Sequence, residues 1–223
     1  MPEETASPAV SGQRVAAELR RLILEGEFQP GQRIGQEMLA ERFNASRMPV
    51  REALRLLESE GLVSIVPHSG AWVSKLDAFE FDQTYKLRGV VEPLAIRESI
   101  PNLTDEQVDR LGQLVEDIKA TTGPGGDVEG FLRLDREFHL LTYAGVRYQA
   151  LTDMVLRQWN TTQHYRRVLV QHQDTADVTA TNLDHELILD SIRRRDLDAA
   201  AAMVKLHIQR TRKTLHRPSD TFG

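Results

Sequence analysis

The sequence has no cysteine among its 223 residues. Disulfides, thiolate metal sites and cysteine nucleophiles are excluded together, so any metal must be held by histidine and carboxylate side chains. Long apolar runs are also missing, and none approaches the roughly 20 residues that a membrane-spanning helix needs. The acidic, proline-containing start MPEETASPAVSG lacks the basic and apolar parts of a signal peptide. We therefore expect a cytoplasmic protein with no membrane partner.

An excess of positive charge is missing as well, because the formal net charge is −5. Residues 1–76 carry 9 basic and 10 acidic side chains, and the remainder carries 19 and 23. Global charge governs solubility, whereas phosphate binding depends on local clustering. Between Arg42 and Arg55, four arginines stand against one glutamate. A local basic surface is therefore available for nucleic acid.

The chain is long enough for two domains. Residues 1–12 are rich in Pro, Ser and Glu and are predicted to be disordered. Residues 13–76 show the order helix, turn, helix, tight turn, helix, hairpin, which is typical of a winged helix-turn-helix. Residues 77–217 show helical patterns alone. We expect a mainly α protein with an N-terminal winged helix-turn-helix and an all-α bundle, whose helices are predicted near 78–99, 105–121, 127–144, 148–171, 178–194 and 197–215.

The segment SRMPVREALRLLESEGLV, residues 46–63, has the marks of a complete helix. Ser46 is placed to cap its first turn with the side-chain hydroxyl, Pro49 falls where a missing N–H is harmless, and Gly61 is placed to end it. One face is apolar and the opposite face carries arginines. The apolar face consists of Val50, Leu54 and Leu57, and the arginines are Arg47, Arg51 and Arg55.

The last helix of a helix-turn-helix lies in the major groove, with its N-terminal residues at base edges. The arginine fork binds guanine or clamps a phosphate, so Arg47 and Arg51 are candidates for base contacts. Arg55 is a candidate for a phosphate contact or an intrahelical partner of Glu52 or Glu58. The alternative is a solvated arginine face on an ordinary helix. The preceding helices and the following hairpin favour DNA binding.

Three histidines and an aspartate in the helical half share a second pattern. Asp135 and His139 are four residues apart on one helix face, and His185 and His207 are in phase with the apolar residues of their helices. Each histidine alone has a simpler interpretation as a hydrogen-bonded core residue. Burying all four groups without a partner is unfavourable, and one divalent ion would satisfy them. Zinc, nickel, manganese and iron are all compatible with this donor set.

The N-terminal motifs resemble a known family. The elements LRRLILEGEFQPGQRI, LAERF, SRMPVREALRLLESEGLV and GAWV occur in the order found in the winged-helix domain of GntR-family bacterial transcription regulators. The resemblance covers residues 14–74. It implies DNA contacts from Ser46, Arg47, Met48 and Arg51, with a wing tip from His68 to Gly70 in the minor groove. Met48 departs from the threonine that is common in the family.

The helical half is similar to the ligand-sensing FCD domain of the FadR-like branch of that family. Many members hold a metal through an Asp, a His four residues later and two further histidines. The matching residues here are Asp135, His139, His185 and His207. This resemblance implies a metal with open positions for the carboxylate of a small organic acid.

Arg88 is a candidate anchor for that acid because it borders an apolar helix face. That face is predicted to consist of Leu87, Val91 and Leu94. The alternative is a surface arginine paired with Glu92 at i+4. Asn160 and Arg166 are further effector-binding candidates on a later helix.

The sequence therefore predicts a metabolite-responsive transcription regulator that is not an enzyme. We expect a homodimer on a palindromic double-stranded operator, with repression released by ligand. One alternative is a metal-dependent phosphohydrolase of the helical His-Asp type, although Asp184 and His185 stand in the reverse order. Another is a DNA-binding protein whose helical half only dimerises around a structural metal.

Overall fold

The computed structural model describes residues 11–122, 126–171 and 175–215. The chain divides into two compact units on either side of the Lys75–Leu76 bond. Residues 1–10, most of the segment expected to be disordered, lie outside the described residues. Ser11 and Gly12 already belong to the start of the first helix, because the Ser11 hydroxyl accepts the N–H of Arg14 at 3.2 Å.

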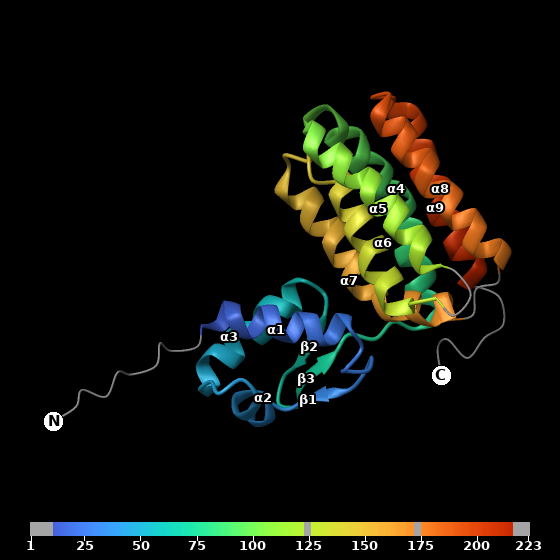
Figure 1. Ribbon diagram of the computed structural model, residues 1–223. Coiled ribbons are helices and arrows are strands. Elements are labelled where there is room, and N and C mark those ends of the chain that lie inside the picture. Colours follow the sequence, from blue (N-terminus) through green and yellow to red (C-terminus); the bar gives the residue numbers. More distant parts are fainter. Residues whose placement is uncertain (1–10, 123–125, 172–174, 216–223) are drawn as a thin grey trace. The chain divides into compact units, whose positions relative to one another are not determined.

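The first unit has the helix and strand order of a winged helix-turn-helix, as expected (Figure 1). Its elements are α1 (Gly12–Leu24), β1 (Arg33–Ile34), α2 (Gln36–Arg42), α3 (Arg47–Ser59), β2 (Val63–Val66) and β3 (Gly70–Val73). The sheet is antiparallel in the order β1-β3-β2. The segment FQPGQRI ends in this sheet, since Arg33 pairs with Trp72 and Ile34 with Ala71.

The core of this unit lies between α1 and α3. Its fully buried members include Val15, Leu19, Leu39, Val50, Leu54 and Leu57. Arg20 of α1 binds Glu60 through two hydrogen bonds of 2.7 and 2.6 Å, which joins α1 to the end of α3. Gly61 follows with a φ of 78°, a conformation that glycine adopts without strain, and it ends α3 as predicted. Because the apolar face of α3 packs against this core, the start of the helix is held at the surface of the unit.

In the second unit the described elements are all helical, which confirms the predicted fold class. They are α4 (Ala78–Ser99), η1 (Ile100–Asn102), α5 (Asp105–Thr121), α6 (Val128–Thr142), α7 (Gln149–Gln171), α8 (Thr175–Arg193) and α9 (Leu197–Leu215). A capping box of Thr104 and Gln107 begins α5, with side-chain to backbone bonds in both directions. The Asp196 carboxylate accepts the N–H of Ala199 at the start of α9.

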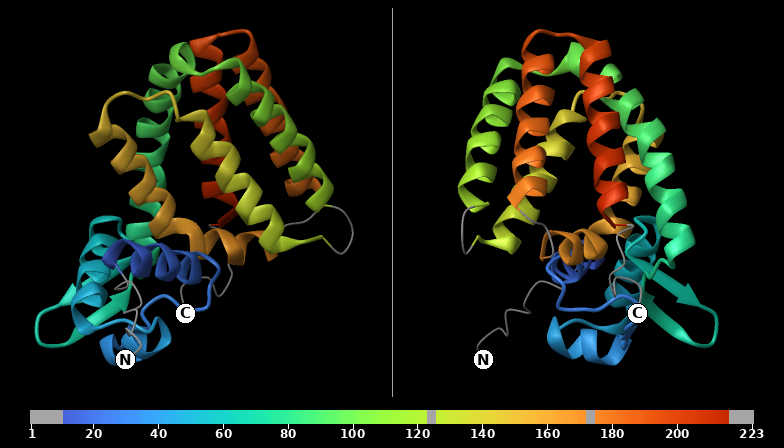
Figure 2. Two further views of the ribbon diagram at one scale, coloured as in Figure 1. Left: turned by 60° about the vertical axis from the view of Figure 1, so that its left-hand side comes forward. Right: turned by 90° about the vertical axis from the view of Figure 1, so that its right-hand side faces the viewer.

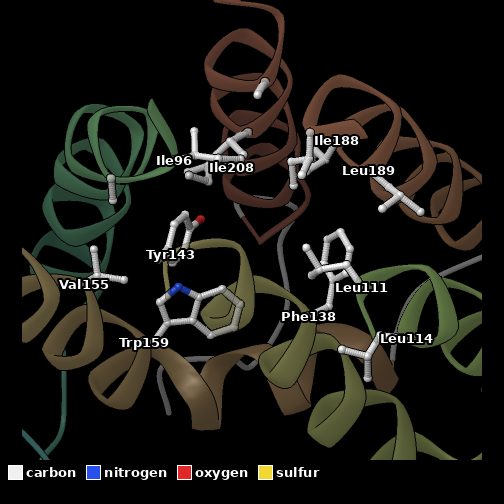
Figure 3. Close-up of a cluster of buried hydrophobic side chains, with 14 of the residues drawn as sticks. Ile96, Leu111, Leu114, Phe138, Tyr143, Val155, Trp159, Ile188, Leu189 and Ile208 are labelled. Carbon is white, nitrogen blue, oxygen red and sulfur yellow. The ribbon is translucent and has the colours of Figure 1, made fainter. Parts of the chain in front are cut away.

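The helices of the second unit form a closed ring (Figure 2). Around the ring, each helix packs against the next in the order α4, α9, α8, α5, α6, α7 and back to α4. Apolar side chains from every helix fill the interior, and Figure 3 shows part of this core around Phe138 and Trp159. No helix within the described ranges combines the length and the apolar character of a membrane span.

Candidate nucleic-acid interface and candidate metal centre

The start of α3 presents an exposed, basic surface. Val50, Leu54 and Leu57 are buried against the core, whereas the opposite face is exposed. The exposed residues are Ser46, Arg47, Met48, Arg51 and Arg55. This is the division of faces that the sequence predicted for a helix that enters a groove.

Ser46 occupies the N-cap position of α3, but its hydroxyl makes no capping bond within the described chain, so that part of the prediction was wrong. A cap side chain bonds the N–H of the second or third helical residue. The third residue is Pro49, which has no N–H. The Ser46 hydroxyl is therefore exposed at a helix N-terminus, where an anion is favoured.

The three arginines of α3 differ in their partners. Arg47 donates from Nη2 to Oε1 of Glu37 on α2 at 2.7 Å, and both side chains are exposed. Arg51 and Arg55 form no ion pair with any residue that the structure describes. The expected intrahelical pairing of Arg55 is not seen, since the Glu58 carboxylate accepts the N–H of Ile65 at 3.0 Å instead.

The hairpin of β2 and β3 forms the wing of the first unit. His68 at its tip is exposed and has a φ of 62°, and Gly70 follows with a φ of 114°. The guanidinium of Arg33 on β1 lies beside the wing. A Cβ atom added to Gly70 would lie 3.5 Å from the Nε atom of Arg33. Arg33 was missed as a candidate because the sequence did not show β1 as a strand.

The predicted metal ligands converge inside the ring of helices. Asp135 and His139 come from α6, His185 from α8 and His207 from α9. One ligand atom from each residue lies within 4.8 Å of the others, and all four side chains are buried. The Asp135 Oδ1 atom lies 3.2 Å from His185 Nε2 and 3.8 Å from His139 Nε2. Residues that are far apart in sequence thus meet at one point.

Five polar atoms of this cluster have no hydrogen-bond partner among the described residues. They are Asp135 Oδ1 and both ring nitrogens of His139 and of His185. Buried polar groups are almost always satisfied, so these unpartnered atoms fit a site that could hold a metal ion. Three imidazoles and one carboxylate suit a divalent transition ion, with one or more further positions left open.

The protonation states suit metal binding. Burial lowers the pKa of His139 well below its ordinary value, and neighbouring cationic groups add to the effect although Asp135 opposes it. Burial raises the pKa of Asp135, but Arg166 and the histidines outweigh it and hold that pKa below the ordinary range. The cluster therefore contains a neutral imidazole and an ionised carboxylate, the forms that coordinate metals.

Asp184 fixes the orientation of His207. Its Oδ2 atom lies 3.2 Å from His207 Nδ1 and accepts a hydrogen bond of 2.6 Å from Arg210. Because this contact engages Nδ1, Nε2 is the His207 atom that could coordinate a metal, an arrangement common among metal-bound histidines. Sequence reasoning noted Asp184 only as the neighbour of His185. Adjacent helical residues point about 100° apart, so Asp184 faces α9.

Arg166, a predicted effector-binding residue, borders the cluster. Its guanidinium contacts Asp135 Oδ2 and lies 4.2 Å from the ring centroid of Trp159. Trp159 in turn lies 5.1 Å from the His139 ring and was not predicted as a site residue. Asn160 is buried, and its side-chain oxygen accepts a hydrogen bond of 2.6 Å from Arg136.

Arg88 lies inside the ring, not on the predicted apolar face. Leu87 and Leu94 are about half exposed on the outer side of α4, so the expected border was wrong. The Arg88 Nε atom donates to Glu92 at 2.6 Å, and Nη1 donates to Thr162 at 3.3 Å. The i+4 pairing with Glu92 is therefore present, but it is buried and not at the surface.

Two family models match the chain. The model described as "Bacterial regulatory proteins, gntR family" matches residues 11–73, and the FCD domain model matches residues 83–210. An uncharacterised HTH-type transcriptional regulator, YdhC of Bacillus subtilis, is 30% identical over 190 residues, which cover 85% of this chain and 84% of that protein. The gluconate operon transcriptional repressor of Bacillus licheniformis is also 30% identical over 190 residues, covering 85% and 76%.

Solved structures share the fold. Escherichia coli McbR/YncC superposes with a TM-score of 0.79 at 24% identity, covering 93% of this chain and 98% of that one. A GntR family member from Pseudomonas syringae superposes with a TM-score of 0.53 at 28% identity, covering 91% and 83%. Because each superposition covers more than nine-tenths of this chain, it includes parts of both units.

Proposed function

The chain belongs to the GntR family of bacterial transcription regulators, with an FCD domain after the DNA-binding domain, and from this premise we propose that it is a homodimeric repressor that senses a small carboxylate through a bound divalent ion. The single observation that carries the proposal is the buried cluster of Asp135, His139, His185 and His207 with its unpartnered atoms. The similarity to a gluconate operon repressor supports repression as the direction of control.

Residues 13–76 are proposed to bind a palindromic operator. The exposed start of α3 supports this role, because its arginines project opposite the buried face. Arg47 and Arg51 are proposed to contact base edges, and Arg55 a phosphate. The full set of proposed DNA-binding residues is Ser46, Arg47, Met48, Arg51, Arg55, His68 and Gly70.

Residues 77–217 are proposed to bind the metal and the effector. A divalent ion held by the four ligands would supply a Lewis-acid contact for a carboxylate. Arg166 is proposed to pair with the acid, since it is buried beside the cluster and its Nε atom has no partner among the described residues. Asn160 and Arg88 keep a proposed role in lining the site, Arg88 through its contacts to Thr162 and Trp159 on α7.

Effector binding is proposed to change operator affinity through a shift between two states of the dimer. A ligand moves such an equilibrium only by its differential affinity for the two states. Two α3 helices must reach half-sites about one DNA turn apart, so a small change in their separation is enough to lose one set of contacts.

The proposal is tested by fluorescence anisotropy of labelled DNA from upstream of the gene, titrated with the full chain. We expect selective, salt-sensitive binding that one member of a panel of small carboxylates weakens. A chelator should remove the response to the acid. His185→Ala should do the same, while Asp190→Ala, an exposed position on α8, should leave it intact. If the affinity for the selected DNA changed neither with metal nor with any acid of the panel, the sensing part of the proposal would be contradicted.

A further inference from the structure

The basic surface at the start of α3 also carries a carboxylate, that of Glu37. Glu37 lies in the first turn of α2, and its Oε1 atom accepts a hydrogen bond of 2.7 Å from Nη2 of Arg47 at the start of α3. The Glu37 and Arg47 side chains are 76% and 73% exposed. A carboxylate beside arginines that meet DNA repels the phosphate backbone and lowers affinity. The presence of Glu37 here therefore needs a reason other than affinity.

Stability gives little reason for the pair. An ion pair between two exposed side chains contributes little to the free energy of unfolding. The two helices already pack through buried apolar side chains, among them Leu39 of α2 and Val50 and Leu54 of α3. A negative charge in the first turn of α2 is favourable, but this effect needs no partner on α3. The reason for the contact therefore lies at the surface that is proposed to bind DNA.

The hydrogen bond restricts the guanidinium of Arg47. An arginine that is free at the surface samples many rotamers, and ordering it on DNA costs free energy. The bond to Glu37 uses one of the five N–H donors of the guanidinium, so donors for the O6 and N7 atoms of a guanine remain. Arg51 and Arg55 form no ion pair within the described part of the chain. Arg47 is thus held in a way that its neighbours on α3 are not.

The carboxylate also changes what Arg47 attracts. The paired side chains carry no net charge together, so they are drawn to the phosphates much less than a free guanidinium is. The remaining N–H groups still match the acceptors on a guanine edge. The pair therefore favours a base contact over a phosphate contact, and it disfavours unrelated DNA more than the correct sequence.

We propose that Glu37 is a positioning residue that sets sequence specificity by holding the Arg47 guanidinium ready for a guanine. The inference rests on the DNA-binding role of the proposed function and adds a specificity-determining residue to it. Glu37 was not among the residues that the sequence predicted to bind DNA. It contacts no base itself and acts through Arg47.

The first test measures the ratio of the affinity for the operator to that for unrelated DNA, by fluorescence anisotropy of the full chain. Glu37→Ala should lower this ratio about 3- to 10-fold, because Arg47 must then be ordered on binding. Its affinity for unrelated DNA should rise at low salt, because a repulsive charge is gone. Glu37→Gln should keep part of the ratio, since its amide oxygen still accepts a bond from Arg47.

Glu41 supplies the matched control. It is exposed on α2 four residues after Glu37 and forms no ion pair with a residue that the structure describes. Glu41→Ala removes the same charge from the same helix but leaves the Arg47 contact in place, so the ratio of affinities should stay that of the wild type. An equal fall of the ratio in Glu37→Ala and Glu41→Ala would mean that charge alone is responsible, and this overturns the proposal. Urea unfolding checks that the variants are folded.

A double-mutant cycle with Arg47→Ala separates positioning from direct reading of the DNA by Glu37. In the Arg47→Ala background, Glu37→Ala should lower the ratio no further, because there is no guanidinium to hold. Operators in which each base pair is replaced in turn locate the contact, and the same base pair should lose its influence in both single variants. If Glu37→Ala lowers the ratio equally without Arg47, the carboxylate itself reads a base, for example the N4 group of cytosine, and the positioning role is overturned.

The two proposals fail in different ways. A wild-type chain that binds no DNA selectively contradicts the DNA-binding role, and with it the role of Glu37. A wild-type chain that binds its operator selectively, with a ratio that Glu37→Ala leaves unchanged, removes only the positioning role.

Discussion

At the scale of single residues, the arginines of α3 are expected to separate into two roles. Arg51→Ala should weaken binding to the operator about 10- to 100-fold and affect unrelated DNA much less, because a bidentate base contact is worth about 1–3 kcal/mol. Arg55→Ala should weaken binding to the operator and to unrelated DNA by a similar factor. It should also reduce by about one the slope of log affinity against log salt concentration. Anisotropy titrations at several salt concentrations measure both quantities. If Arg51→Ala weakened binding to the operator and to unrelated DNA by the same factor, as expected for Arg55→Ala, the base contact of Arg51 would be contradicted.

The second expectation at this scale concerns Asp184 as a positioning residue. Asp184→Asn keeps the size of the side chain but removes the charge beside His207 Nδ1. Loss of such an outer partner lowers metal affinity about 10- to 100-fold. Titration calorimetry with Zn²⁺ and Ni²⁺ measures the effect, and Asp190→Asn on the same helix is the control. Circular dichroism checks folding, and unchanged affinity in a folded Asp184→Asn protein would contradict the role.

The ligand cluster could be predicted from the sequence, but its surroundings could not. Helical phase alone shows that His185 and His207 face inward, because apolar residues recur on the same side. Phase does not show which side of a helix is inside when both are apolar. This is the case in α4, where Leu87 and Leu94 are exposed and Arg88 is buried. Contacts such as that of Trp159 with His139 depend on how neighbouring helices are rotated, which no local pattern records.

At the scale of elements, the start of α3 has a cap residue whose hydroxyl does not cap the helix. Ser46→Ala removes a hydroxyl that makes no capping bond in the described chain. The free energy of unfolding should therefore change by less than about 0.5 kcal/mol, compared with about 1 kcal/mol for a working cap. Operator affinity should fall, because the hydroxyl lies where a phosphate is expected.

Thr104→Ala is the matched comparison for Ser46→Ala. Thr104 is an N-cap whose side chain accepts the Gln107 N–H, so this variant should lose stability and keep its DNA affinity. Urea unfolding and anisotropy distinguish the two outcomes. A large loss of stability in Ser46→Ala would mean that the hydroxyl supports the helix after all.

The long helices could be predicted to within three residues at each end, because their limits carry chemical signals. Thr104 and Asp196 accept backbone N–H groups at helix starts, as their positions before helical segments predict. β1 could not be predicted, since two residues are too few to show an alternation. It exists because β3 offers Arg33 and Ile34 a free edge, which is a contact between segments distant in sequence.

At the scale of the whole molecule, the two units should respond differently to metal removal. The four proposed ligands come from three helices of the ring, so a bound ion would join α6, α8 and α9. An ion at 100 times its dissociation constant stabilises the folded state by about 2.7 kcal/mol, and chelation should lower the melting temperature of this unit by roughly 5–10 °C. Hydrogen exchange should show faster opening of these helices and unchanged protection of α1 and α3. An equal change in both units would contradict a metal confined to the ring.

Operator and effector must also influence each other equally if both bias the same dimer equilibrium. An acid that weakens operator binding tenfold at saturation must itself bind tenfold more weakly to the operator complex, because the coupling free energy belongs to the pair of ligands. Titration calorimetry of that acid into the metal-loaded protein, with and without operator DNA, measures the factor by which the operator weakens binding of the acid. The anisotropy titrations give the factor by which the acid weakens binding of the operator. If the two factors agree, effector and DNA act through a shared equilibrium between states. If the acid binds equally well with and without operator, its effect in the anisotropy assay arises outside the protein, for example by removing metal in solution, and the sensing role of the helical unit is contradicted.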